Sequence, residues 1–272
     1  MQGELIAVKD DITTLQSSSS GGGTLIDTTD NLYFVVNSIT GDDSNIGNDS
    51  FPFATLERAI EELKKYRIAH NVSLNLDGGG TWDLVNPVFD FTGLTLVGNR
   101  DITFFKYDGV ILDPIIMNHP LATLIVEGIT WHLTKPLRLV AQNNIFLNSF
   151  QFIAIQAFGT GSGRGYLIEL LGCQNIVLGG NLFAQAGGSN LDGGMVARNS
   201  TGIRMGGNFN DFSKTEIVIQ NGSVVWIESA NFNTSTSTNK ISALYSVVML
   251  GSGTTLNNQP RSITRSLLVA NT

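Results

Sequence analysis

The sequence has little charge, a single cysteine and no concentration of basic residues. Charged residues make up 14% of its 272 residues, against about 25% in ordinary soluble domains. The formal net charge is −7 and Lys and Arg form no run, so binding to nucleic acid phosphates is not expected. The lone Cys173 excludes an internal disulfide. Because it follows the apolar run Leu167–Leu171, we predict that its side chain is buried and unreactive.

Long apolar stretches are also missing. No segment is long and apolar enough to cross a membrane, and the N-terminus lacks the apolar region of a signal peptide. We therefore expect a soluble protein made in the cytoplasm, with no membrane insertion. If it acts outside the cell that makes it, we expect it to travel there by another route, such as inside or upon a larger particle.

Motifs for cofactors and metals are absent as well. The loop Gly41–Asn48 is rich in Asp and Asn but does not follow the residue order of an EF-hand. The glycine-rich stretches Gly161–Gly165 and Gly187–Gly194 do not lie between a strand and a helix, as a phosphate-binding loop would. No metal and no cofactor are expected.

A five-residue block recurs eight times along the chain. Each block has apolar residues at positions one and three and Gly or Ser at position five. The blocks are Leu74–Gly78, Leu94–Gly98, Leu124–Gly128, Ile145–Ser149, Ile176–Gly180, Ile203–Gly207, Val225–Ser229 and Val248–Ser252. In a strand, the two apolar residues point to the same face, and the small fifth residue suits a turn. Successive blocks start 20 to 31 residues apart.

This variable spacing excludes repeats of fixed length and fits an all-β protein, a parallel β-helix. In that fold each rung reuses one strand–turn unit, and the connecting loops vary in length. Strands stack at roughly 4.8 Å, so eight rungs would form a column about 35 Å long. The alternative is chance recurrence of the block in a glycine-rich β protein. The column is expected over residues 72–272.

The N-terminus predicts a separable anchor. Residues 1–16 form a short helix with apolar positions in the a/d pattern of a coiled coil. These positions are Leu5, Val8, Ile12 and Leu15. A helix this short has marginal stability alone in water. We therefore expect it to associate with partners, anchoring the protein to the virion and forming the seam of a trimer. The alternative is a frayed amphipathic tail. Residues 17–31, which begin with a Ser/Gly run, form a flexible linker.

Residues 32–71 are expected to cap the column. A buried strand over residues 32–36 precedes the Asp-rich loop, and a helix begins after its N-cap residue, Thr55. The apolar stripe of this helix comprises Leu56, Ala59, Ile60 and Leu63. An open column end exposes strand edges and core, and we expect the helix to cover them.

The order of motifs between residues 33 and 82 resembles a known family. It runs through Tyr33–Asn37, Gly41–Asn45, Gly47, Pro52–Leu56, Ala59–Ile60 and Gly80–Trp82. This order resembles the N-terminal signature of the pectate-lyase-like β-helix of phage tail spikes and tail fibres. The resemblance implies a right-handed column capped by strand, loop and helix. It also implies a homotrimer located on the virion, joined through its N-terminus to phage tail or other virion proteins, with a host surface glycan or protein as target.

The chain departs from that family in two ways. It is short for a polysaccharide-degrading spike. Residues 253–272 also show no obvious C-terminal trimerisation or receptor module. Both departures weigh against catalysis.

Three fourth positions of the blocks carry carboxylates that are candidates for catalysis. Asp77, Glu127 and Glu228 all occupy that position, so we expect them on one ridge of the column. Asp77 and Glu127 would stand two rungs apart, about 10 Å, close to the roughly 6.5–9.5 Å separation of inverting glycosidases. The alternative is that the ridge faces a turn and merely tolerates polar residues.

Five large aromatic residues are candidates for stacking on sugars or for contact with a receptor. They are Trp82, Tyr107, Trp131, Tyr166 and Trp226. Packing in the core or between subunits is the more frequent role of such residues.

Two functions remain open. The first is a non-enzymatic tail fibre or spike component, a homotrimeric β-helix for host attachment or for structural adaptation. The second is a tail-spike depolymerase, a glycoside hydrolase or lyase that cuts a surface polysaccharide through paired carboxylates.

Overall fold

The computed structural model describes residues 24–77, 82–85, 87–106, 109–154, 165–184, 191, 193–210, 215–232, 239–251, 254 and 261–270. The helix expected over residues 1–16, with its seam residues Leu5, Val8, Ile12 and Leu15, lies outside these residues. Most of the expected linker, up to residue 23, lies outside them as well.

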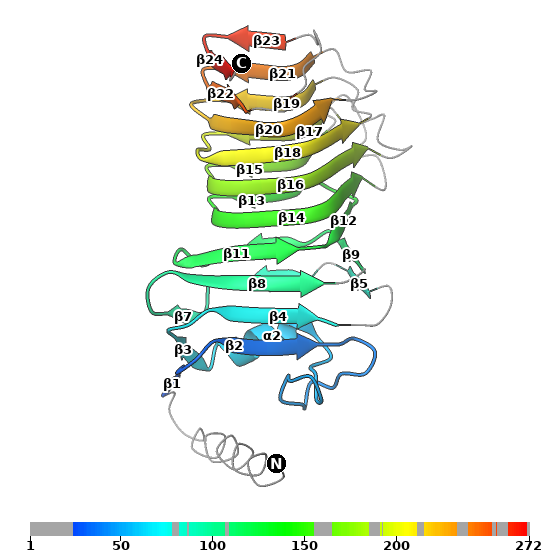
Figure 1. Ribbon diagram of the computed structural model, residues 1–272, viewed down its shortest axis with the longest axis vertical. Helices are drawn as coiled ribbons and strands as arrows, with labels where there is room; N and C mark the ends of the chain where they lie inside the picture. Colours follow the sequence, from blue (N-terminus) through cyan, green and yellow to red (C-terminus); the bar gives the residue numbers. More distant parts are fainter. Residues whose placement is uncertain are drawn as a thin grey trace.

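The chain forms a column of stacked rungs, as the sequence predicts (Figure 1). Every strand pairing among the described residues is parallel. Parallel pairing between strands 20 to 40 residues apart requires a crossover in each turn, which here runs through a second sheet or, in the N-terminal rungs, through small sheets. The prediction of an all-β parallel β-helix is confirmed.

Two sheets form the main faces of the column. The long sheet contains, in order, β2 (Leu32–Val36), β4 (Val72–Leu76), β8 (Arg100–Lys106), β11 (Ala122–Glu127), β14 (Asn143–Ala154), β16 (Gln174–Ala184), β18 (Ile203–Asn210), β20 (Val224–Phe232), β22 (Val247–Leu250) and β24 (Leu267–Ala270), with β5 (Trp82–Val85), β9 (Gly109–Leu112) and β12 (Thr130–Leu133) joined beside it. The second sheet contains β13 (Leu137–Val140), β15 (Tyr166–Leu171), β17 (Gly193–Arg198), β19 (Thr215–Gln220), β21 (Asn239–Leu244) and β23 (Arg261–Thr264).

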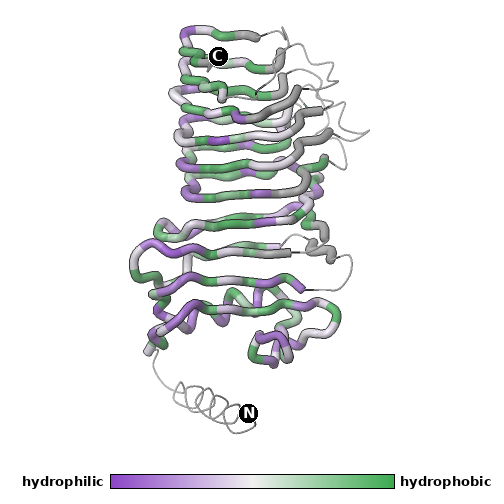
Figure 2. Tube along the Cα trace, viewed as in Figure 1, coloured by the Kyte–Doolittle hydropathy of each residue, from purple (hydrophilic) through white to green (hydrophobic). Residues whose placement is uncertain are grey.

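Two small sheets complete the N-terminal part of the column. One joins β1 (Ile26–Asp27), β3 (Tyr66–Ile68) and β7 (Thr95–Leu96), and the other joins β6 (Val88–Asp90) and β10 (Ile115–Met117). Apolar and polar residues alternate along the strands, as Figure 2 shows by colour.

The core is built from two inward rows of the long sheet. One row comprises Val72, Ile102, Leu124, Ile145, Ile176, Ile203, Val225 and Val248, and the other comprises Leu74, Phe104, Val126, Leu147, Leu178, Met205, Ile227 and Leu250. All of these side chains are buried in one hydrophobic cluster. Each apolar residue therefore stacks on its equivalents in the rungs above and below, which a single rung could not provide.

The six blocks from Leu124 to Val248 stack in register as predicted. The first block is offset by two residues, because Val72 and Leu74 rather than Leu74 and Leu76 occupy its apolar rows. The block Leu94–Gly98 was assigned wrongly: it contributes β7 to a small sheet. Its rung in the long sheet is β8, whose fifth position is Lys106 rather than Gly or Ser.

The helix α2 (Leu56–Leu63) lies at the N-terminal end of the column (Figure 1). Thr55 is its N-cap, as predicted, and its hydroxyl accepts a hydrogen bond of 3.2 Å from the backbone N–H of Arg58. The four predicted apolar residues are buried in the same cluster as the inward rows. The helix thus closes the core at this end, and the capping prediction is confirmed.

Asp43 ties the Asp-rich loop to the start of this helix. Its carboxylate accepts hydrogen bonds of 2.9 Å from the backbone N–H groups of Ala54 and Thr55, and one of 2.8 Å from the Thr55 hydroxyl. The Arg58 side chain donates to the Asp43 carbonyl at 3.0 Å. The carboxylate thus acts as a structural brace at the positive end of the helix dipole.

Two glycines of the loop have no room for a side chain. A Cβ on Gly41 would lie 2.2 Å from the Phe53 carbonyl oxygen, and a Cβ on Gly47 would lie 2.2 Å from the Phe53 ring. Gly47 also has a φ of +78°, which favours glycine. The glycines of the N-terminal signature thus allow the loop to close over Phe53, which is fully buried.

The turns from the second sheet to the long sheet contain a ladder of small polar residues. We call it the turn ladder: Cys173, Ser200, Ser223, Ser246 and Ser266. The backbone N–H of Cys173 donates to Ser200 Oγ at 3.0 Å, and that of Ser200 donates to Ser223 Oγ at 3.1 Å. The thiol of Cys173 is buried, as predicted, and burial raises its pKa. The ladder satisfies backbone groups that would otherwise be buried without partners.

Replacing Asp43 with alanine should lower the free energy of unfolding by about 1–3 kcal/mol, because two half-buried N–H groups at the helix start lose their acceptor. Urea unfolding followed by circular dichroism would measure this change. The control is Asp49→Ala in the same loop, where the carboxylate is exposed and accepts a hydrogen bond from Tyr33 at 3.1 Å. Equal effects of the two substitutions would contradict the bracing role of Asp43.

Candidate functional site

The outward face of the long sheet carries a row of mostly apolar side chains. We call it the outer row: Ile125, Phe146, Val177, Arg204, Trp226, Met249 and Val269. Each residue lies between the two inward positions of its strand, so strand alternation turns it outward. These side chains are half-buried, except for the exposed Arg204 and Val269. They form one straight and mostly apolar stripe along the column, with Arg204 near its middle.

Arg204 and Trp226 form the central contact of this row. The guanidinium carbon of Arg204 lies 5.4 Å from the centre of the Trp226 ring, which is cation–π geometry. Gly251 of the next rung leaves space for the ring, because a Cβ there would lie 3.0 Å from Trp226 Nε1. The indole is therefore held by packing from both neighbouring rungs.

Beside the outer row runs the row of fourth positions. It comprises Glu127, Asn148, Gly179, Gly206, Glu228 and Gly251. Glu127 and Glu228 are exposed. A Cβ on Gly206 would lie 2.5 Å from the Glu228 carbonyl oxygen, so close backbone approach restricts this position to glycine. The two carboxylates of this row are therefore separated by Asn148 and two glycines and do not form a cluster of acids.

The structure corrects the predicted position of Asp77. Asn75, not Asp77, pairs in register with Phe105, which in turn pairs with Glu127. Asp77 lies two residues further along the chain, so it does not share a ridge with Glu127. Two rungs and two residues separate their backbones by about 12 Å, so Asp77 lies further from Glu127 than two rungs alone would place it. The offset of the first block explains the error.

Glu127 and Glu228 do share a ridge, as predicted, and stand four rungs apart. That separation corresponds to about 19 Å, too far for a catalytic pair within one chain.

The five predicted aromatic residues have different positions. Trp131 is fully buried, stacked on Phe152 with ring centres 6.1 Å apart, so it is a core residue and cannot contact a sugar. Trp226 lies in the outer row, and Tyr166 is half-buried at the start of β15. The structure describes only the backbone of Trp82, in β5, and Tyr107 lies outside the described residues.

Sequence analysis missed Phe146 and Tyr245. Phe146 occupies the second position of its block, and that position alone would have indicated an outward side chain. Tyr245 lies in a turn and is 49% exposed, a position for which the block pattern gives no signal.

The perturbed carboxylates serve turns rather than a reaction. The backbone N–H of Ser44 donates to Asp42 and lowers the pKa of that carboxyl, and the Thr92 hydroxyl lowers the pKa of Asp90 in the same way.

Within the part of the chain that the structure describes, no three His, Cys, Asp or Glu residues gather as metal ligands. No helix among the described residues is long and apolar enough to span a membrane.

Comparisons with known proteins give no family. No protein-family model and no curated protein matches the chain. Among solved structures, the chain is similar to the native GH136 lacto-N-biosidase from Eubacterium ramulus, with a TM-score of 0.29 and 10% sequence identity. The match covers 88% of this chain and 55% of that one, so the chain spans about half of its length. A similarity of this degree assigns no activity.

Replacing Trp131 with alanine should lower the free energy of unfolding by about 3–5 kcal/mol, because it opens a cavity inside the column. Tyr33→Ala is the matched control: Tyr33 is 46% exposed, and its loss should cost about 1 kcal/mol or less. Urea unfolding monitored by circular dichroism distinguishes the two variants. A small effect at Trp131 would show that its side chain is not a core element.

Proposed function

We propose that this chain is a shaft segment of a phage tail fibre or tail spike, without enzymatic activity. It acts as a homotrimer on the virion, in host attachment or as a structural adaptor. The observation that carries the proposal is the outer row. The N-terminal cap supports it, since the glycines and the Thr55 helix start of the signature have defined structural roles here.

The outer row suits contact between copies of the chain. Its seven residues occupy successive rungs, so the stripe is about 29 Å long. Mostly apolar surface of this kind marks interaction sites, and aromatic residues, Met and Arg are enriched at protein interfaces. Three copies packed about a common axis would cover three identical stripes at once. The straightness of the column lets the contact continue from rung to rung.

Attachment to the particle is assigned to the N-terminal segment. Leu5, Val8, Ile12 and Leu15 present one apolar seam in the sequence, and three such seams would associate as a short coiled coil. The partners would be phage tail or other virion proteins, and the target would be a host surface glycan or protein.

The alternative function is a polysaccharide depolymerase. It is supported by the exposed Glu228, which lies next to Trp226 on the outward face. A catalytic pair would then need a carboxylate from a second subunit, because the acids of one chain's ridge lie too far apart.

The oligomeric state tests the proposal directly. At micromolar concentration the protein should sediment as a trimer. Val177→Glu should raise the dissociation constant of the trimer at least tenfold, because the substitution places a carboxylate in each of three facing stripes. Ser242→Glu, at an outward half-buried position of β21 in the second sheet, is the matched control and should remain trimeric. A monomeric parent protein would contradict the proposed function.

A glycan-degradation assay separates the two functions. We expect no release of reducing ends from capsule or lipopolysaccharide of the host. If ends are released, and Glu127→Gln or Glu228→Gln abolishes the release while Asp49→Asn retains it, the depolymerase is correct and the non-enzymatic shaft is wrong. Asp77→Asn belongs to the same series, and its separation from Glu127 predicts no effect.

A further inference from the structure

One turn position is occupied by left-handed residues in six successive rungs. They are Ala141, Gly172, Asn199, Asn221, Tyr245 and Arg265, with φ between +48° and +65°. Each follows the last residue of a strand of the second sheet and immediately precedes the rung's return to the long sheet. Gly and Asn adopt this conformation readily, whereas other residues lose about 1–2 kcal/mol. The last two rungs thus place the two bulkiest residues where the fold favours small ones.

These two side chains are arranged against each other. The guanidinium carbon of Arg265 lies 5.5 Å from the centre of the Tyr245 ring, and Arg265 Nη1 donates a hydrogen bond to the Tyr245 hydroxyl. Both side chains are exposed. Tyr245 is the one hydrogen-bond partner of the Arg265 side chain found within the described residues. The guanidinium is therefore held in place while its other donors are not used by the described protein groups.

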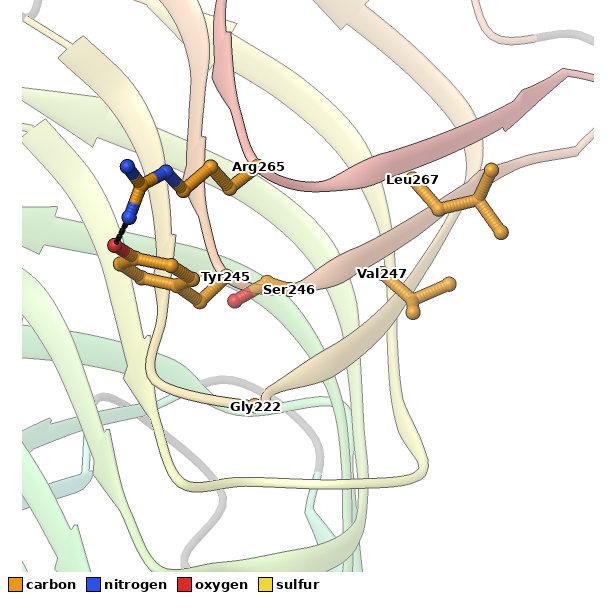
Figure 3. A pocket seen from close by; sticks show the side chains of 6 residues that line it. All are labelled: Gly222, Tyr245, Ser246, Val247, Arg265 and Leu267. Atoms are coloured by element: carbon orange, nitrogen blue, oxygen red, sulfur yellow. Dashed lines mark hydrogen bonds between the residues drawn. The ribbon is translucent and has the colours of Figure 1, made fainter.

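A shallow pocket of about 420 Å³ adjoins this pair. Figure 3 shows Tyr245 and Arg265 on one side and Val247 and Leu267 on the other, with Ser246 between them and Gly222 below. Leu267 is 58% exposed. At Gly222 a Cβ would meet nothing within 4 Å, so this part of the rim is open. The hollow thus has Tyr245 and Arg265 at one edge and an apolar wall at the other, and the side chains of the pair extend outward, away from that wall.

We propose that this pocket and the adjoining Arg265 guanidinium bind an oligosaccharide whose sugars carry carboxylates. A guanidinium presents paired donors that match a carboxylate, and its position on Tyr245 reduces the entropy lost on binding. Val247 and Leu267 would contact the apolar face of a neighbouring sugar in the same oligosaccharide, because they line the hollow beside the pair. Naming a glycan rests on the proposed function in host attachment, and the pocket gives that function a substrate class.

The choice of residues at this turn position strengthens this inference. The left-handed conformation itself belongs to the fold, since all six rungs share it. In the two preceding rungs this position is occupied by Asn199 and Asn221, and the same turn closes there without a bulky side chain. Tyr245 and Arg265 are therefore not needed to make the turn. Their shared position on neighbouring rungs is what brings them together.

Isothermal titration of the full-length protein tests the pocket. The probes are an oligomer of galacturonic acid, an oligomer of sialic acid and a neutral oligomer of galactose. At least one acidic probe should bind, with affinity at least tenfold above the neutral probe. Arg265→Asn and Tyr245→Asn should each weaken that binding at least tenfold, and Arg265→Lys should weaken it less.

The Asn variants are chosen because Asn199 and Asn221 occupy the same turn position, so both variants should fold with thermal stability equal to or above the parent. Arg67→Asn, which removes an exposed cation paired with Asp27 at the N-terminal end, is the control for charge and should bind as the parent does. Absence of binding to both acidic probes, equal binding of the neutral probe, or unchanged binding by Arg265→Asn would each overturn the proposal. If binding fails while sedimentation still gives a trimer, only the pocket is wrong; a monomer contradicts the proposed function itself.

Discussion

Parallel pairing in fixed register is the constraint on which the whole molecule depends. Each strand of the long sheet pairs with the equivalent residues of the next rung, so Leu124 lies on Ile145 and Ile145 on Ile176. A slip of one residue would turn the inward rows outward, because side chains alternate between faces. The same register aligns the serines of the turn ladder, the glycines beside Glu228 and the residues of the outer row. Core, turns and surface thus follow from one repeated geometry.

Much of this fold could be predicted from the sequence. The spacing of apolar residues identified six rungs, and the stripe on α2 with its Thr55 cap identified the covered end. The rung of β8 was missed because Lys106 stands where the pattern requires Gly or Ser, although Ile102 and Phe104 fill the core like their neighbours. Periodicity marks a rung only where its turn also requires a small residue.

The surface was less predictable, because it depends on register between rungs. Trp131 and Trp226 are the same residue type, yet one is buried and the other lies in the outer row. The alternation in Thr130–Leu133 contained the signal for Trp131, since Leu133 shares its face and is also buried. Asp77 was misplaced by a two-residue offset. Tyr245 and Arg265 lie 20 positions apart, and only the stacking of their turns brings them into contact.

The closed N-terminal end has a consequence for biogenesis. The ribosome delivers residues 32–76 before the rest of the column, and these already contain α2 and the first paired strands β2 and β4. Later strands can then pair one at a time with the last completed rung, so each strand pairs with one that lies about one rung earlier in the sequence. Between the blocks at Leu124 and Val248 this separation is 21 to 31 residues. Such short reaches keep the entropy of closing each coil low. Strand pairing that proceeds from the capped N-terminal end during synthesis would leave one unpaired strand edge exposed at any moment. This limits mispairing with other nascent chains.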